Sequence, residues 1–124
     1  MVTLTLVPTI TRTQPWNPAT ATEEIRKIAT GINLKLTYQG RCIEQLQERG
    51  LIVGDVLYIL RHGFVYAAAQ TTTREEYYKY HMESTTPNSG NRAIRVIAIP
   101  DPIRCWLKVL DVMWIDERWY VGRA

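Results

Sequence analysis

Three basic side chains whose spacing suits a single reactive surface lie in the C-terminal half of the sequence. Lys79 and His81 are two positions apart in the alternating run 77–83, so in a β-strand they point to the same face. Arg95 lies in the middle of the β-branched run 93–99, and neighbouring strands bring side chains within about 5 Å of each other. Histidine and lysine transfer protons, and arginine stabilises negative charge. We therefore predict Lys79, His81 and Arg95 as candidate catalytic residues, although such residues also occur on solvent-facing sheets that bind nothing.

Three further residues are candidates for binding: Arg49, Tyr77 and Arg92. Arg92 belongs to the segment 77–110, which holds five Lys and Arg residues against two acids. The whole chain has eleven arginines and four lysines, and guanidinium pairs bidentately with phosphates and carboxylates. Tyr77 could stack on a base or simply fill a half-buried strand. Arg49 falls in the last turn of a predicted helix, where it could contact phosphate or cap the last carbonyls.

Other kinds of site are disfavoured by the sequence. His81 and Glu83 have the spacing of two metal ligands on one strand, but the only other histidine, His62, lies elsewhere in the chain. Cys42 and Cys105 cannot form a four-thiolate zinc site or a disulfide framework, and we interpret them as small buried apolar residues. No glycine-rich loop has the spacing that cradles phosphates. We therefore expect neither a metal nor a cofactor.

The length and composition indicate one soluble domain. The chain has 124 residues, of which 46% are hydrophobic and 22% charged, with a net charge of +3. Its apolar runs are shorter than the roughly 20 residues of a membrane-spanning helix, and residues 1–10 lack the pattern of a secretory leader. We expect a cytoplasmic protein that does not bind membranes. Its predicted parts are an N-terminal strand extension (residues 1–14), a helical half (15–63), an antiparallel meander (74–116) and a tail (117–124).

The helical half is predicted from capping residues and glycine stops. A short strand over residues 2–6 precedes a helix that begins at Asn17 and Pro18 and stops at Gly31. A second short strand, around residues 34–36, leads to a helix that we expect Thr37 to cap. That helix ends at Gly50, and a third covers residues 53–61 and stops at Gly63. The second helix should bury a stripe formed by Cys42, Ile43 and Leu46.

The meander is predicted from alternation and turn residues. Strands over residues 77–83, 93–99 and 106–115 are separated by the turn 86–91 and by Pro100-Asp101-Pro102, which should end pairing. In the last strand, Leu110, Val112 and Trp114 should share a face. The chain order predicts an α+β fold with helices packed on one face of a small antiparallel sheet. The predicted core consists of Trp16, Ile25, Ile28, Cys42, Leu46, Leu57, Leu60, Tyr80, Val96, Val112 and Trp114.

Several short motifs, taken together, resemble a known family. Pro15-Trp16 precedes a helix containing Glu24-Ile25-Arg26-Lys27-Ile28, and the chain continues with residues 34–37, Glu48-Arg49-Gly50, Asp55-Val56-Leu57 and Tyr77-Tyr78-Lys79-Tyr80, ending with residues 109–116. This spacing resembles the small bacterial domain of unknown function four-two-five-eight, a family of toxin-associated and mobile-element proteins. The resemblance covers about residues 15–116 and implies a fold like that of RelE and barnase-like ribonuclease toxins.

The resemblance carries a functional expectation and one departure from the family pattern. RelE-like cleavage activates a 2′-hydroxyl, stabilises the phosphorane charge and protonates the leaving oxygen, all without a metal, and Lys79, His81 and Arg95 are residues of the right types. Family members place a His-Ala pair after the threonine that opens the second helix, whereas this chain has Tyr38-Gln39-Gly40. Because an amide does not titrate near neutrality, Gln39 cannot carry a proton there.

Two classes of function follow. The first is a toxin-like protein with a RelE fold, associated with a mobile element, that acts on RNA or the translation apparatus. Its partner would be RNA or the ribosome, and such a toxin could also bind a cognate antitoxin. The second is a noncatalytic inhibitor, encoded by a phage or plasmid, that binds a protein of a host defence or regulatory complex. A DNA-binding protein is less favoured because no predicted helix carries a basic recognition face.

Overall fold

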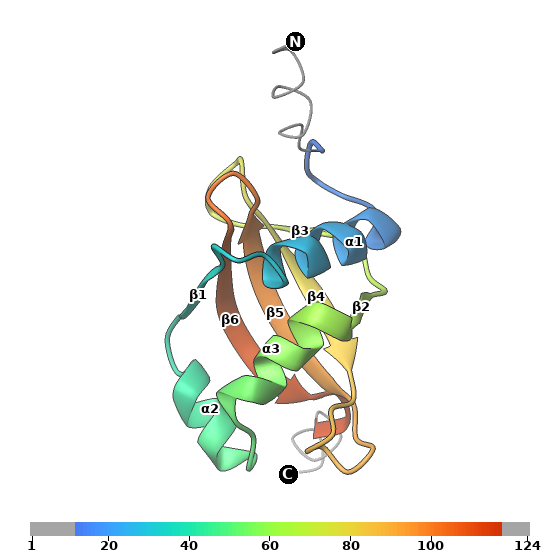
Figure 1. Cartoon of the computed structure of the whole chain (residues 1–124), viewed down its shortest axis with the longest axis vertical. Coiled ribbons are helices and arrows are strands. Elements are labelled where there is room, and N and C mark those ends of the chain that lie inside the picture. The colour runs from blue at the N-terminus through green and yellow to red at the C-terminus, as the bar shows by residue number, and fades with distance from the viewer. Residues whose placement is uncertain (1–11, 118–124) are drawn as a thin grey trace.

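Residues 12–117 fold into three α-helices and a six-stranded mixed sheet, an α+β architecture (Figure 1). The computed structural model describes residues 12–117, so the strand predicted over residues 2–6 and nearly all of the predicted tail lie outside the described residues. The elements are α1 (Pro18–Ala29), β1 (Lys35–Tyr38), α2 (Cys42–Glu48), α3 (Val53–His62), β2 (Phe64–Val65), β3 (Gln70–Thr71), β4 (Tyr78–Ser84), β5 (Ile94–Asp101), β6 (Trp106–Trp114) and the short 3-10 helix η2 (Ile115–Glu117).

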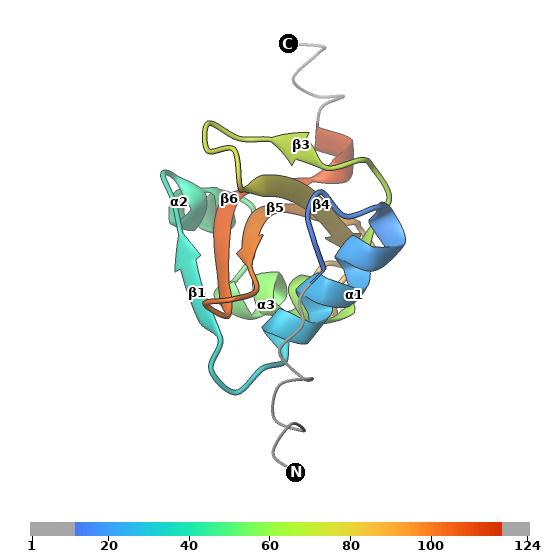
Figure 2. The same cartoon turned by 90° about the horizontal axis from the view of Figure 1, so that it is seen from above.

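The sheet has the strand order β1-β6-β5-β4-β2, and β3 pairs with β4 as well. The central strands β4, β5 and β6 form the predicted antiparallel meander. At one edge β1 runs parallel to β6, so the sheet is mixed and not purely antiparallel. At the other edge β2 and β3 pair with different parts of β4, and β3 lies in a segment whose polar composition gives no strand signal. Figure 2 shows how strongly β4, β5 and β6 curve around the helices.

The first helix follows its capping residues. The side chain of Asn17 accepts a hydrogen bond of 2.8 Å from the Thr20 amide, and Pro18 occupies the first helical position. The predicted cap of the second helix is wrong. Thr37 belongs to β1, where its hydroxyl accepts a bond from Trp106, and α2 begins only at Cys42. Gly40 has a φ of +63°, which turns the chain from β1 into α2.

Two predictions about the last two strands are also wrong. Pairing does not stop at Pro100, because the hairpin register continues to Asp101 opposite Trp106. Pro100 lacks only its own backbone N–H donor. The strand tolerates this because the pairing of β5 with β4 has already ended at Ala98, so Pro100 has only β6 as a paired neighbour. Leu110 does not share the inner face with Val112, because a β-bulge opposite the Ile97/Ala98 step adds one residue to β6 and shifts the alternation.

The core lies between α1, α3 and the inner face of the sheet. Nine of the eleven predicted core residues are buried there. Leu57 is only half-buried, and Trp114 packs against the core from the side, with Arg92 lying over its ring at 4.0 Å. Ile43, predicted in the buried stripe of α2, is 45% exposed. Cys42 is a buried free thiol as expected, whereas Cys105 is a half-buried one.

Candidate functional site

Within residues 12–117, no helix covers the face of the sheet opposite α1 and α3, and we call it the open face (Figure 2). Residues of β4 and β5 alternate between it and the core: Tyr80 and Met82 are buried, whereas Lys79 and His81 are half-buried and point outward. Its outward side chains come from four strands and include Lys35, Thr37, Lys79, His81, Glu83, Arg95, Ile97, Ile99, Asp101, Trp106, Lys108, Leu110, Asp111 and Met113.

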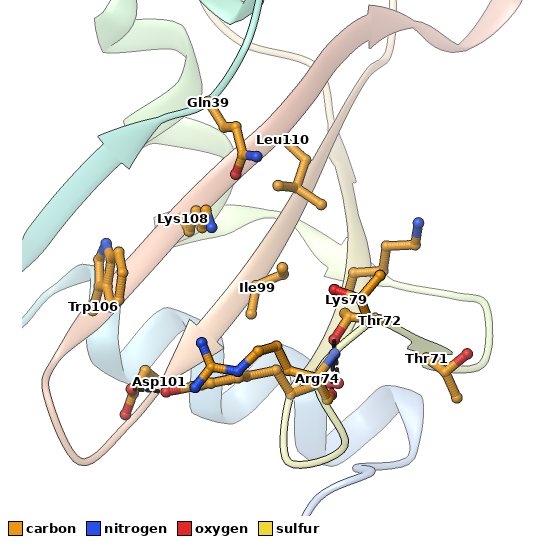
Figure 3. Close-up of a pocket in the computed structure, with 12 residues that line it drawn as sticks. Gln39, Thr71, Thr72, Arg74, Lys79, Ile99, Asp101, Trp106, Lys108 and Leu110 are labelled. Carbon is orange, nitrogen blue, oxygen red and sulfur yellow. Dashed lines mark hydrogen bonds between the residues drawn. The ribbon is translucent and has the colours of Figure 1, made fainter.

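A pocket of about 450 Å³ lies in one half of the open face (Figure 3). Ile99 and Leu110 form its apolar floor. One wall comes from β6 and the end of β1 and carries Gln39, Trp106 and Lys108. The opposite wall consists of Lys79 and the loop after β3, residues 71–74. Apolar surface therefore lies at the base of the pocket, and positive charge lies on both walls.

The strand register places two lysines on opposite sides of the floor. The β5–β6 register pairs Ile99 with Lys108. The β4–β5 register ends one residue earlier, at Tyr80 opposite Ala98, and its continuation would bring Lys79 to the other side of Ile99. All three side chains line the pocket, so this row carries a cation on each side of the isoleucine. Neither ammonium group has a carboxylate within 4.0 Å in the described part of the chain.

Trp106 is held in a fixed orientation in the neighbouring row. Its indole Nε1 donates a hydrogen bond of 2.8 Å to the Thr37 hydroxyl on β1. The ammonium group of Lys35 lies 5.0 Å from the centre of the indole ring. The pocket wall therefore combines a fixed aromatic ring with a further cation.

One end of the pocket is closed by a network around Asp101. Its carboxylate accepts bonds of 2.8 Å from the Tyr77 hydroxyl and 2.9 Å from the Arg104 guanidinium. Burial alone would raise the pKa of Asp101, but these hydrogen bonds and the positive charge of Arg104 lower it below its ordinary value. The bond to Asp101 raises the pKa of Tyr77. Arg74, whose guanidinium lies 5.3 Å from the Tyr77 ring, extends this end.

The structure brings the three predicted catalytic residues onto one face but not into one cluster. Lys79 lines the pocket, and His81 follows one position further along the same face, opposite Ile97. Arg95 lies beyond His81 and donates to Glu83 at 2.7 Å. Burial lowers the pKa of His81, and the charges of Arg95 and Lys79 lower it further. His81 is therefore the histidine on this face that stays neutral at neutral pH.

Of the predicted binding residues, Tyr77 lines the pocket, whereas Arg49 and Arg92 do not. Arg49 ends α2 and pairs with both carboxylate oxygens of Glu117, at 2.8 Å and 2.6 Å. Arg92 forms an ion pair of 2.6 Å with Asp116. Both arginines therefore anchor η2 to the rest of the fold.

Carboxylates neutralise most arginines but few lysines. Seven described arginines have an acidic partner within 4.0 Å: Arg12, Arg41, Arg49, Arg74, Arg92, Arg95 and Arg104. Of the lysines, Lys27 has such a partner, whereas Lys35, Lys79 and Lys108 have none in residues 12–117. These three lysines all lie on the open face, so its uncompensated positive charge comes from lysine and not from arginine. The carboxylate of Asp111, on the same face, accepts a hydrogen bond of 3.0 Å from the neutral Gln45 amide.

Sequence reasoning missed Lys108, Trp106 and Arg74 as members of the site. The alternation of Trp106 and Lys108 with buried Leu107 and Val109 could have placed the first two on the open face. Arg74 had no such signal, because the loop that carries it has no periodicity. Gln39, noted only as a departure from a family pattern, also lines the pocket.

The described residues show no cluster of three or more histidine, cysteine, aspartate or glutamate side chains that could hold a metal ion. No helix within residues 12–117 is long and apolar enough to cross a membrane. Comparisons with protein families, with curated proteins and with solved structures gave no match to this chain. The assignment of function therefore depends on the surface chemistry of the described residues.

Proposed function

We propose that the open face binds RNA. We further propose that the protein is toxin-like, is associated with a mobile genetic element, and acts on RNA or the translation apparatus. The observation that carries the proposal is the set of three lysines, all on the open face, that have no carboxylate partner among the residues that the structure describes. RNA is a polyanion, and lysines that neutralise its phosphates supply much of the binding free energy.

Residue types on the same face support an RNA ligand over a simple anion. Trp106 and Tyr77 are aromatic side chains at the pocket, and aromatic rings beside a basic groove are how many proteins bind single strands. The family resemblance described for the sequence points in the same direction.

Cleavage at this face would need no metal. A neutral His81 can accept the proton of a 2′-hydroxyl as its oxygen attacks the adjacent phosphorus. The bond from phosphorus to the 5′-oxygen then breaks, and the leaving 5′-oxygen takes a proton from water, which leaves a 2′,3′-cyclic phosphate and a new 5′-hydroxyl; protonated His81 returns its proton to solvent. Lys79 would stabilise the added charge on the phosphorus oxygens. Gln39, whose amide does not exchange protons near neutrality, would contribute hydrogen bonds only.

The test is binding of a fluorescein-labelled single-stranded RNA as a function of salt concentration. Lys79→Ala and Lys108→Ala should each weaken binding and reduce the slope of log K against log salt by about 0.7. Lys27→Ala is the matched control, because Lys27 lies on α1, behind the sheet, and its side chain is 71% exposed. Equal affinity in all four proteins would contradict the proposal.

A cleavage assay on the same RNA separates an enzyme from a binding protein. If the face is catalytic, His81→Gln should reduce the cleavage rate by at least about tenfold while RNA binding stays the same. If wild-type protein binds RNA but does not cut it, the protein acts by occupying RNA.

The second candidate function, a noncatalytic inhibitor that binds a protein, is favoured by a different surface. Phe64 and Tyr66 are 49% and 69% exposed, and their rings stack with centres 6.1 Å apart. Arg26 lies over Phe64 at 4.4 Å and donates to backbone carbonyls instead of a carboxylate. Exposed aromatics beside arginine are typical of protein interfaces. The test is a double variant that carries both Phe64→Ser and Tyr66→Ser. If this variant loses the biological effect of the wild-type protein in cells but keeps its affinity for RNA, the result would support this candidate.

A further inference from the structure

We propose that the pocket on the open face holds a single nucleotide of an unpaired RNA strand, with its phosphate between Lys79 and Lys108 and its base against Trp106. The proposal rests on the proposed function, since it names the unit of RNA that this face recognises. It divides the pocket into a phosphate position and a base position, each defined by different residues.

The phosphate position follows from Lys79 and Lys108, which line the pocket with Ile99 between them (Figure 3). The strands that carry the two lysines, β4 and β6, lie on either side of β5, and adjacent strands are about 4.8 Å apart, so the lysines start about 10 Å from each other. Their flexible four-carbon stems can bring both ammonium groups to one anion above Ile99. Because no carboxylate competes for them within the described chain, both charges are available to a ligand.

The base position follows from the neighbouring row. Trp106 lies beside the phosphate position on β6, and its bond to Thr37 fixes the indole plane before any ligand arrives. A ring that is already ordered loses little conformational entropy when a base stacks on it. Every base presents a flat π-face, so this contact recognises a nucleotide without selecting its sequence.

Hydrogen-bonding groups at the rim suit the edge of an unpaired base. The side-chain amide of Gln39 makes no hydrogen bond within the described residues, and it points toward Leu110 and the pocket (Figure 3). An amide can both donate to and accept from a base edge, as proteins do when they read splayed-out bases. In a duplex these edges are already paired, so the pocket requires single-stranded RNA.

The size and rigidity of the pocket agree with a single nucleotide. Its volume of about 450 Å³ lies within the range of small-molecule sites. The loop wall is preformed, because the Thr72 hydroxyl accepts from the Arg74 amide at 3.0 Å and lies 3.1 Å from the Tyr77 carbonyl. The network around Asp101 closes one end of the pocket. An RNA strand would therefore place one nucleotide in the pocket, and the rest of the RNA would lie along the open face away from Asp101.

The experiment is a heteronuclear NMR titration with uridine monophosphate, uridine and inorganic phosphate as separate probes. The indole N–H signal of Trp106 is assigned from the spectrum of Trp106→Phe, which keeps an aromatic ring at that position. Uridine monophosphate should shift this signal saturably, and uridine and phosphate should each bind at least about tenfold more weakly. Lys108→Ala should weaken the nucleotide by a similar factor, and Lys27→Ala should leave its affinity unchanged.

Each other outcome overturns the proposal in a recognisable way. If phosphate alone binds as tightly as the nucleotide, the base position does not exist. If an RNA oligomer binds but uridine monophosphate does not, the open face binds RNA without a single-nucleotide pocket, and only this inference fails. If neither binds, the proposed function fails with it.

Discussion

Arg95 on β5 donates a hydrogen bond of 2.7 Å to Glu83, its cross-strand partner on β4. Both side chains are about one-fifth exposed, at 20% and 17%. The arginine that looks most like a phosphate ligand in the sequence is thus already neutralised in the fold. Among the described residues, the positive charge of the open face without a carboxylate partner comes instead from Lys79, which the sequence singled out, and from Lys35 and Lys108, which it did not.

This ion pair gives a prediction about RNA affinity. Glu83→Gln removes the acid, keeps its shape and leaves Arg95 with an uncompensated charge, so RNA should bind more tightly, with a salt slope larger by about 0.7. The free energy of unfolding should fall by about 1–3 kcal/mol, because the variant leaves a largely shielded Arg95 without its charge-assisted hydrogen bond. Fluorescence anisotropy at several salt concentrations measures the first quantity and chemical denaturation the second. Unchanged RNA affinity would place the bound RNA away from Arg95.

His81 should titrate below the ordinary histidine range. Burial, and then the charge of Arg95, lowers its pKa in the folded protein. Between that pKa and about 6.5 the unfolded chain binds more protons, so the free energy of unfolding should rise with pH in this window and fall as pH drops below about 6.5. NMR titration of the imidazole carbons gives the pKa directly.

Two variants check the cause of the His81 shift. Arg95→Gln removes a repelling cation and frees Glu83, whose charge favours the protonated ring, so the pKa of His81 should rise. His81→Gln should remove this residue's contribution to the pH dependence of stability. A pKa that does not move in Arg95→Gln would mean that burial alone accounts for the shift.

Arg49 should act through stability and not through RNA. Its two hydrogen bonds hold Glu117, and a third, of 3.0 Å, caps the Gln45 carbonyl in the last turn of α2. Arg49→Ala should therefore lower the free energy of unfolding by about 1 kcal/mol, and Glu117→Gln should act in the same direction. RNA affinity should be unchanged in both. A loss of RNA binding in Arg49→Ala but not in Glu117→Gln would restore Arg49 as a binding residue.

The hydroxyl of Tyr80 should matter for folding alone. It accepts a bond of 3.0 Å from the buried Trp16 amide and donates one of 3.0 Å to the Gln14 side chain. Tyr80→Phe keeps the ring that stacks on Trp16 but leaves that amide without a partner, which should cost about 1–3 kcal/mol. Chemical denaturation measures the loss, and RNA binding serves as the control because Tyr80 faces the core. A stability equal to wild type would mean that water replaces the hydroxyl at Trp16.

Local signals predicted much of the fold, and long-range contacts decided the rest. The cap at Asn17 and the stop at Gly63 are local, and α1 and α3 have nearly the predicted bounds. Thr37 looked like a cap because threonine often is one, yet its hydroxyl bonds to Trp106, which lies 69 residues further along the chain. The bulge that turns Leu110 outward depends on how β6 pairs with β5. The residues around Leu110 alone therefore do not predict the bulge.

The candidate site was predictable to the extent that strand alternation determines a face. Lys79 and His81 were predicted as outward neighbours and lie that way. The sequence could not predict which arginines and lysines have a carboxylate partner. Ion pairs such as that between Arg49 and Glu117 join residues 68 positions apart in the chain. The loop wall of the pocket likewise depends on β3, a strand of only two residues.

The central claim is that RNA binds to the open face, and chemical-shift mapping tests it most directly. Amide signals of isotopically labelled protein are followed while a short single-stranded RNA is added. The largest shifts should occur in β4, β5 and β6 around Lys79, Ile99 and Lys108, and they should shrink in Lys108→Ala but not in Lys27→Ala. Shifts confined to the β2 edge of the sheet around Phe64 and Tyr66, or no shifts at all, would contradict the account.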